Sequence, residues 1–288
     1  MIDENEIAII SRDDLRIVDF DGNEVNKPLQ KATWTVSAAQ KDGYPHFMLK
    51  EIFEQPKAVK DTVSTRITEN GINFEGIKDG EFKDIERMHI VACGTAMHAG
   101  MVGKYIIESM ARIPVEVDIA SEFRYRNPIL GKKDYLIIIS QSGETADSLA
   151  ALRLGKKMGV KTLAVVNVVG SSIAREADHV IYTWAGPEIA VASTKAYTTQ
   201  LACLGMLAAY IQAENTGVYE RELLAALQLI PEQMEQLIAE TETILKQYAE
   251  EHLWDAHDTF FLGRGLDYAS AMEGQLKLKE ISYIHGEA

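Results

Sequence analysis

Hydroxyl side chains are concentrated in the segment Ser140-Gln141-Ser142-Gly143-Glu144-Thr145, which follows an apolar run and precedes a helical pattern. Its three hydroxyls, a conformationally permissive glycine and the free N–H groups of a helix N-terminus form a neutral cradle for an anion, which the helix dipole also favours. The alternative is that these Ser and Thr side chains only cap the helix, as such residues routinely do. The spacing favours a phosphate-binding loop and leaves the structural cap as the alternative.

Two further loops repeat this chemistry, Cys93-Gly94-Thr95 and Val191-Ala192-Ser193-Thr194-Lys195, each at the start of a helical stretch. Loops that follow parallel strands meet at one edge of a sheet, where open α/β proteins bind ligands. Helix capping is again the alternative for each loop taken singly. We expect Cys93 to pack as a small apolar side chain rather than act as a nucleophile, because free cysteine is usually buried.

Lys277 and Glu280 are three residues apart in a helical pattern, so they share one face of the helix. One interpretation is a solvated ion pair. The other is a carboxylate base beside a cation, which suits proton transfer next to a carbonyl because the cation stabilises the enolate-like charge that develops. We expect His285 to be structural or exposed. Gly263-Arg264-Gly265 does not predict dinucleotide binding, because Tyr268 stands where the third glycine would be.

Composition excludes several classes of protein. The 288 residues contain 29 Lys and Arg against 43 Asp and Glu, a net charge of −14, which argues against a nucleic-acid binder. No stretch reaches the ~18 apolar residues of a membrane span, and the charged first residues are not those of a signal peptide, so we expect a cytoplasmic protein. The only cysteines, Cys93 and Cys203, have no metal-ligand spacing, so we expect neither disulfide nor metal.

The elements that position these loops read as an α/β fold. Continuous apolar, largely β-branched runs alternate with helical stretches of about 10–15 residues, which is typical of a parallel sheet covered on both faces. The runs lie at 88–92, 115–119, 135–139, 162–166 and 180–184. We therefore expect a three-layer sandwich with a five-stranded parallel sheet spanning residues 80–215.

The flanking segments have other patterns. Residues 1–36 predict small antiparallel strands, and 37–79 a linker with the helices that lead into the sheet, broken at Pro45 and Pro56. Residues 216–257 predict connecting helices, the second of them opened by Pro231. Residues 258–288 predict one strand and one helix. Because a strand needs neighbours to satisfy its backbone groups, we expect this to be the truncated start of a second α/β domain.

Five motifs, taken together and in order, resemble the glutamine:fructose-6-phosphate amidotransferases, the glucosamine-6-phosphate synthase family. The resemblance runs from about Lys41 to the last residue. The motifs are Cys93-Gly94-Thr95, Ser121-Glu122-Phe123-Arg124-Tyr125-Arg126, Ser140-Gln141-Ser142-Gly143-Glu144-Thr145-Ala146-Asp147, Val191-Ala192-Ser193-Thr194-Lys195-Ala196 and Leu276-Lys277-Leu278-Lys279-Glu280-Ile281-Ser282-Tyr283-Ile284-His285.

The resemblance implies a sugar isomerase (SIS) domain with a flavodoxin-like sheet, then the first strand–helix unit of a second SIS domain. It implies that residues 1–36 are the tail of a glutaminase domain, that the partners include the rest of that domain and a C-terminal remainder, and that the enzyme is a homodimer without a cofactor. The expected ligands are fructose 6-phosphate and glucosamine 6-phosphate. Glu280 is implied as the base for isomerisation and Lys277 as its charge-stabilising partner. The residues implied in substrate binding are Cys93, Gly94, Thr95, Ser140, Gln141, Ser142, Thr145, Val191, Ala192 and Ser193.

Two departures from the family pattern matter. The family usually has serine where this chain has Ala96, which removes one hydroxyl donor. The family's ring-opening histidine and Schiff-base lysine match positions beyond Ala288, so we expect this chain to bind the sugar phosphate without completing the reaction. The alternatives are an SIS-type sugar-phosphate deglycase or deaminase, which would not need residues 1–36, and a non-catalytic sugar-phosphate-binding module, which would not need Lys277 and Glu280.

Overall fold

The computed structural model describes every residue except Met1, Asp3 and residues 28–39. The chain forms two compact units, Met1–Ala38 and Ala39–Ala288.

The first unit contains a β-hairpin. Strand β1 (Glu6–Ile10) pairs antiparallel with β2 (Leu15–Asp19), so the prediction of small antiparallel strands is confirmed for this segment. A turn at Asp21 and Gly22 follows β2, and Gly22 has a positive φ of 85° there.

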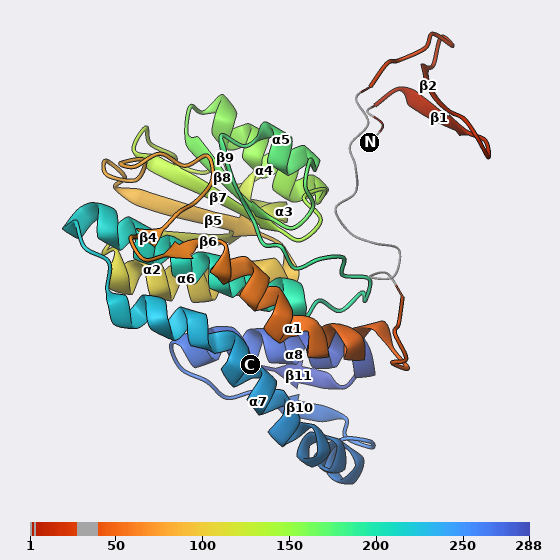
Figure 1. Ribbon diagram of the computed structural model, residues 1–288, viewed down its shortest axis with the longest axis vertical. Coiled ribbons are helices and arrows are strands. Elements are labelled where there is room, and N and C mark those ends of the chain that lie inside the picture. The colour runs from red at the N-terminus through yellow and green to blue at the C-terminus, as the bar shows by residue number, and fades with distance from the viewer. Residues whose placement is uncertain (1, 3, 28–39) are drawn as a thin grey trace. The chain divides into compact units, whose positions relative to one another are not determined.

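The second unit is built on a five-stranded sheet in the order β6-β5-β7-β8-β9, with every neighbouring pair parallel, as predicted (Figure 1). The strands are β5 (Arg87–Ala92), β6 (Val115–Ile119), β7 (Asp134–Ser140), β8 (Lys161–Val166) and β9 (His179–Tyr182). All seven residues of the central β7 are buried, which is why its middle, Tyr135–Ile139, is continuously apolar instead of alternating.

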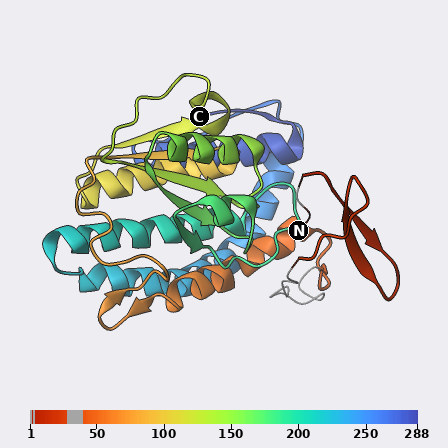
Figure 2. The same ribbon diagram turned by 90° about the horizontal axis from the view of Figure 1, so that it is seen from above.

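Helices cover both faces of this sheet (Figures 1 and 2). One face carries α2 (Gly94–Met110) and α6 (Lys195–Thr216), and the other carries α3 (Ala120–Phe123), α4 (Ala146–Lys157) and α5 (Ser172–Glu176). Along β7 the side chains alternate between the two cores: Ile137 and Ile139 belong to the first, and Leu136 and Ile138 to the second. This is the predicted three-layer sandwich.

The strand order creates a switch point between β5 and β7. From β5 the chain moves to the edge strand β6, then returns across β5 to β7 and continues through β8 to β9. The connections after β5 and β7 therefore leave in opposite directions and open a crevice at the carboxyl ends of these two strands.

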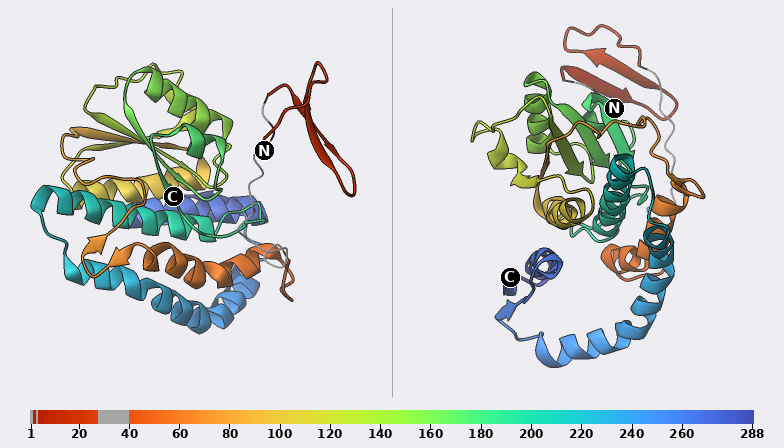
Figure 3. Two further views of the ribbon diagram at one scale, coloured as in Figure 1. Left: turned by 45° about the horizontal axis from the view of Figure 1, so that its top comes forward. Right: turned by 90° about the vertical axis from the view of Figure 1, so that its left-hand side faces the viewer.

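Two long helices pack beyond α6. Helix α1 (Phe47–Ser64) contacts both α6 and α7 (Arg221–His252), and Figure 3 shows the orange α1 beside the blue α7 on the side of α6 away from the sheet. A small hairpin, β3 (Ile67–Thr68) with β4 (Gly71–Ile72), follows α1 and was not predicted. Among the described residues, no helix is both long and apolar enough to cross a membrane.

The prolines of these helices do not act as predicted. Pro45 lies just before α1, but Pro56 lies inside it, and Pro231 lies inside a continuous α7 instead of opening a second helix. A proline inside a helix removes its own N–H donor and crowds the carbonyl four residues earlier. Pro231 nevertheless continues the buried stripe of Leu224 and Leu227 on α7. Packing outweighs the local cost of the proline.

The C-terminal segment forms a strand–helix–strand unit rather than a single strand and helix. Strand β10 (Asp258–Phe260) leads to α8 (Leu266–Ser282), and β11 (His285–Glu287) then pairs parallel with β10. The expectation of a single strand in this segment is wrong, because Tyr283, with φ 60°, ends α8 in the left-handed conformation and turns the chain back into β11. Helix α8 packs against α2, which brings it to the carboxyl edge of the sheet.

Candidate active site

A cavity of about 250 Å³ lies at the switch point, at the carboxyl ends of β5 and β7. Five parts of the second unit contribute to it: the turn after β5, the loop after β7, the loop before α6, helix α6 and helix α8. The lining residues are Cys93, Thr95, Ala96, Ile139, Ser140, Gln141, Ser142, Thr145, Val191, Ser193, Gln200, Lys277 and Glu280. The three loops that the sequence marked by their hydroxyls therefore meet in one place.

The loop after β7 is shaped by Gly143. Its φ is 66°, and a Cβ at this position would lie 2.0 Å from Ser171 Oγ, so only glycine fits. The resulting bend places Ser140 Oγ 3.0 Å from Thr145 Oγ1 and 3.0 Å from the Gly143 N–H that it accepts. Thr145 occupies the cap position of α4, yet its side chain makes no capping hydrogen bond. The hydroxyls thus gather at a helix N-terminus without serving as its cap, an arrangement suited to an anion.

The turn after β5 connects the sheet to α8. The Thr95 hydroxyl donates to Glu273 Oε1 at 2.9 Å and accepts from Lys277 Nζ at 2.9 Å. Cys93 is half-buried: it packs against the apolar core on the α4 face, as expected of a small apolar side chain, and it also lines the cavity. Gly94 has φ 54° at the first position of α2.

Helix α8 carries a chain of charges toward the cavity. Lys277 Nζ lies 2.5 Å from Glu280 Oε2 and 3.4 Å from Glu273 Oε1. Glu273 Oε2 in turn lies 2.8 Å from His98 Nδ1 on α2, and both of these side chains are buried. The predicted pair of Lys277 and Glu280 therefore exists, but the lysine, whose side chain is 17% exposed, is held among three polar partners in a cavity and is not a solvated surface cation.

A single carboxylate holds the loop before α6. Glu188 Oε2 accepts from Ser193 Oγ at 2.9 Å, while Oε1 accepts from the N–H groups of Thr194 at 2.8 Å and Ala196 at 3.1 Å. Thr194 is the cap residue of α6, but its own side chain makes no capping hydrogen bond. Glu188 therefore does the capping from six residues away and fixes Ser193 in the same contact.

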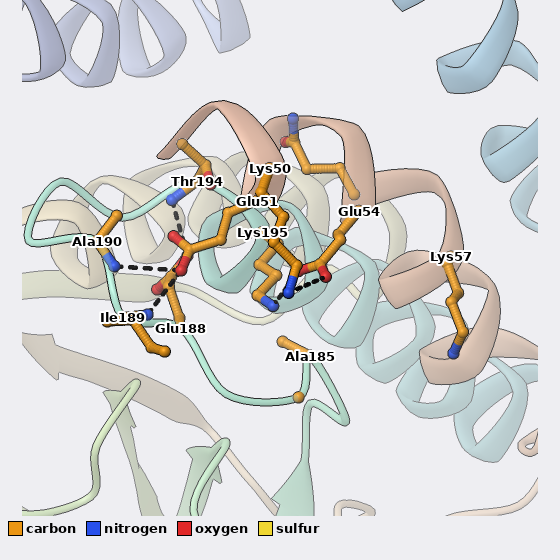
Figure 4. A network of polar contacts seen from close by, with 12 residues as sticks. Lys50, Glu51, Glu54, Lys57, Ala185, Glu188, Ile189, Ala190, Thr194 and Lys195 are labelled. Atoms are coloured by element: carbon orange, nitrogen blue, oxygen red, sulfur yellow. Dashed lines mark hydrogen bonds and ion pairs between the residues drawn. The ribbon is translucent and has the colours of Figure 1, made fainter. Parts of the chain in front are cut away.

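Helix α1 anchors the same loop from the other side (Figure 4). Glu51 Oε1 accepts from the N–H groups of Ile189 at 2.6 Å and Ala190 at 3.1 Å, and Lys195 Nζ lies 2.6 Å from Glu54 Oε2. Burial raises the pKa of the Glu51 carboxyl above its ordinary value. The loop is thus tied to α1 by its backbone, independently of any ligand.

Most of the predicted site residues line the cavity. The two that do not are Gly94 and Ala192, each of which lies between lining neighbours. Val191 lines it although its side chain is 99% exposed. His285 is exposed in β11, 3.2 Å from Asp258, and lies outside the cavity. In the part of the chain that the structure describes, no three His, Cys, Asp or Glu side chains form a cluster suited to a metal ion.

Sequence reasoning missed Glu273, His98, Glu188 and Gln200. The sequence could have indicated Glu273, because it precedes Lys277 by four residues and Glu280 by seven and therefore shares their face of the helix. The others had none, because their positions at the site come from the packing of α2 and α6 and from the course of a loop.

Comparison with known proteins gives consistent matches. Residues 81–210 match the family model of the SIS domain. Two bacterial relatives named glutamine–fructose-6-phosphate aminotransferase [isomerizing], from Caldanaerobacter subterraneus subsp. tengcongensis and Clostridium tetani, are 53% and 54% identical over the whole of this chain, which spans 48% of the length of each. The solved C-terminal domain of glucosamine-fructose-6-phosphate aminotransferase from Francisella tularensis is 42% identical, with a TM-score of 0.78 over 86% of this chain and 71% of that one.

Proposed function

This chain belongs to the glutamine–fructose-6-phosphate aminotransferase family, as its motifs predicted, and on that premise we propose that its cavity binds fructose 6-phosphate for conversion to glucosamine 6-phosphate. The observation that carries the proposal is that Lys277 and Glu280 line the same cavity as the three hydroxyl-bearing loops. One end of that cavity suits a phosphate, and the other suits proton transfer on the sugar.

The phosphate would lie in the loop after β7. Ser140, Ser142 and Thr145 offer hydroxyl donors, and the first backbone N–H groups of α4 have no partners within the helix. The positive end of the helix dipole adds to the attraction. A net charge of −14 does not oppose this binding, because the donors act locally and distant charges are screened in salt.

The sugar carbons would lie toward α8. Ammonia derived from glutamine would replace the C2 carbonyl oxygen of fructose 6-phosphate, with loss of water. The Glu280 carboxylate would then take a proton from C1 and return it to C2. The imine nitrogen gains a proton when C1 is deprotonated, and the C1 hydroxyl loses its proton when C2 is protonated, so that C1 becomes the aldehyde carbon and C2 carries the amine. Negative charge develops on the C1 oxygen as its hydroxyl proton leaves, and the Lys277 ammonium would stabilise it.

The surroundings of Lys277 support this role. Its ammonium contacts Thr95 Oγ1 at 2.9 Å and Glu280 Oε2 at 2.5 Å, so once α8 is docked against α2 the position of the cation is set by contacts within the protein. A preorganised charge costs little rearrangement when the reaction occurs. A module that only binds sugar phosphate would need neither this cation nor the neighbouring carboxylate.

A sugar-phosphate deaminase or deglycase would use the same pair in the reverse direction. The unit Met1–Ala38 favours the amidotransferase, because a stand-alone SIS enzyme has no need of an additional strand pair, and we propose that it is the tail of a glutaminase domain. The chain's partners would then be the rest of that domain, the C-terminal remainder and a second copy of the chain. The cytoplasmic location stays a prediction from the sequence.

Two variants test the proposal, one expected to change the binding of fructose 6-phosphate and the other expected to change the exchange of its C1 proton. Thr145→Ala removes a donor from the phosphate loop, so calorimetry on this chain should show fructose 6-phosphate binding weakened by about 1–3 kcal/mol. Glu280→Gln keeps the size and hydrogen bonding of the side chain, so binding should change little.

Solvent exchange of the C1 proton gives the second readout, in a protein that extends this chain to the length of its relatives. Glu280→Gln should lower the exchange rate by at least ~100-fold, the usual scale of general-base catalysis. Retained exchange in Glu280→Gln would refute the base, and unchanged affinity in Thr145→Ala would refute the phosphate loop.

A further inference from the structure

Gln200 lines the cavity, and its side-chain oxygen has no hydrogen-bond partner among the residues that the structure describes. It lies in the second turn of α6, and it is 1% exposed. Its Oε1 atom is buried and accepts no hydrogen bond from any residue that the structure describes. Burying a polar amide without a partner is unfavourable, so such a group in a ligand cavity calls for an explanation.

The chemistry of the unpaired atom restricts the missing partner. An amide oxygen only accepts hydrogen bonds, so its partner must be a donor. A phosphate dianion has no proton to donate, and under the proposed function it would lie at the donors of the loop after β7. A sugar hydroxyl donates and accepts, and it therefore matches an amide that offers both an acceptor and a donor.

We propose that the Gln200 amide binds a hydroxyl of the sugar chain and thereby selects a polyhydroxylated phosphate ester over other phosphates. This inference rests on the proposed function, because it takes the ligand of the cavity to be a sugar phosphate. It assigns to α6 the recognition of the sugar, whereas the loop after β7 recognises the phosphate.

The variant Gln200→Met tests this assignment, since methionine has nearly the same shape and no comparable hydrogen-bonding group. Calorimetry on this chain compares fructose 6-phosphate with inorganic phosphate. We expect fructose 6-phosphate to bind about threefold to tenfold more weakly to the variant, the loss of one hydrogen bond, and inorganic phosphate to bind equally well to both proteins. Thr199→Val is the matched control: this buried neighbour bonds only to carbonyls of its own helix and does not line the cavity.

A stability measurement separates recognition from a structural role. Replacing an unpaired buried amide by an apolar group of similar shape should leave the thermal midpoint of the free protein unchanged or raise it. A structural amide would instead give a lower midpoint. Gln200→Leu repeats the comparison, and failure of both variants to fold would show that the fold itself needs the amide and would overturn the proposal.

The remaining outcomes are distinct. If the wild-type chain does not bind fructose 6-phosphate, the proposed function fails and this inference fails with it. If the wild-type chain binds it and Gln200→Met binds it equally well, only the role of Gln200 is refuted. Equal weakening for fructose 6-phosphate and inorganic phosphate would place the amide at the phosphate and would also refute the sugar contact.

Discussion

Ser193, which lines the cavity, is held in place by Glu188, a residue that does not line it. Its hydroxyl donates to Glu188, whose other oxygen caps α6 through the N–H groups of Thr194 and Ala196. One carboxylate thus serves both the start of a helix and a residue of the cavity wall. Removing the Glu188 carboxylate should therefore lower both the free energy of unfolding and the affinity for the sugar phosphate.

We therefore expect Glu188→Ala to lower the free energy of unfolding by about 1–2 kcal/mol, the usual cost of a lost helix cap, and to weaken fructose 6-phosphate binding several-fold. Denaturant unfolding and calorimetry measure the two effects. Glu242→Ala, on the exposed surface of α7, is the control and should change neither. A variant that loses stability but binds normally would show that Ser193 does not need its anchor.

At the scale of single residues, the sequence predicted the parts of the site that follow strands directly. Thr95, Ser140 and Thr145 could be placed because a hydroxyl after an apolar run has an expected position in a parallel sheet. Gln200 could not, since a glutamine in the second turn of an apolar helix looks the same whether it lies in the core or in a cavity. Only the packing of α6 decides which.

The strands β5, β6 and β7 share a cluster of charges at the sheet edge opposite the cavity. His89 lies 3.3 Å from Asp134, which also pairs with Arg87 at 2.7 Å, and Glu116 lies 3.6 Å from the same histidine. Burial lowers the pKa of His89 below its ordinary value and outweighs the attraction of the two carboxylates. The pKa of Asp134 is also lowered, through its hydrogen bonds to Arg87, Gly131 and His89, which outweigh its burial.

These two shifts act in the same direction on stability. Below the ordinary histidine pKa of about 6.5, the unfolded chain binds a proton at His89 more readily than the folded chain does. The contribution of His89 to the free energy of unfolding is therefore fully present above that pH and is lost as the pH falls below it. Asp134 adds a further loss at still lower pH, below its ordinary pKa of about 3.9.

We expect the thermal midpoint to fall between pH 7 and pH 5, and to fall less in His89→Gln, which does not titrate. His252→Gln, exposed on α7, is the control and should follow the wild type. Equal slopes for His89→Gln and wild type would exclude His89 as the titrating group.

Element types were predicted better than element ends. The apolar runs predicted all five strands of the main sheet, because a strand buried on both faces consists almost entirely of apolar, often β-branched residues. The prolines of α1 and α7 misled, because packing between these two helices overrides a local signal. The last strand, β11, has only three residues and no apolar run, so it exists through its pairing with β10 alone.

On the scale of the whole molecule, exposed apolar side chains are concentrated toward the end of α7 and just beyond it. They are Leu237, Ile244, Leu245, Tyr248 and Trp254, each more than half exposed. The spacing of Leu237, Ile244, Leu245 and Tyr248 places these four on one face of α7. Exposed apolar patches mark interaction sites, which agrees with the homodimer that the family resemblance implies.

We expect the chain to self-associate through this surface, with sedimentation velocity at micromolar concentration showing a species heavier than 32.0 kDa. Leu245→Glu should shift the population toward the monomer, since burying an unpaired charge at an interface is costly. Ile129→Glu, a substitution at an isolated exposed apolar residue, should not. A monomeric wild type would contradict the expectation.

The thin packing of α8 has a consequence for how the site is completed. Its buried residues are Ala269, Ala271, Glu273 and Gln275, so little apolar surface holds it to α2, and much of the attachment is the polar contact with Thr95 and His98. Elements held in this way open locally at low cost and behave as separate cooperative units. Docking of α8 is then an equilibrium, and the reactive pair is present only in its closed state.

A ligand that contacts both the loop after β7 and α8 binds the docked state more tightly and so shifts the equilibrium toward it. A ligand that contacts only the loop after β7 binds both states equally and causes no shift. Amide hydrogen exchange in residues 266–282 should therefore slow with fructose 6-phosphate and stay unchanged with inorganic phosphate. Unchanged exchange with both ligands would show that α8 is already fully docked, and equal slowing by both would show that docking does not require the sugar. If the two ligands differ, the sugar phosphate brings Lys277 and Glu280 into place as it binds. Inorganic phosphate, or a phosphate ester too short to reach α8, would then occupy the loop without assembling the catalytic pair.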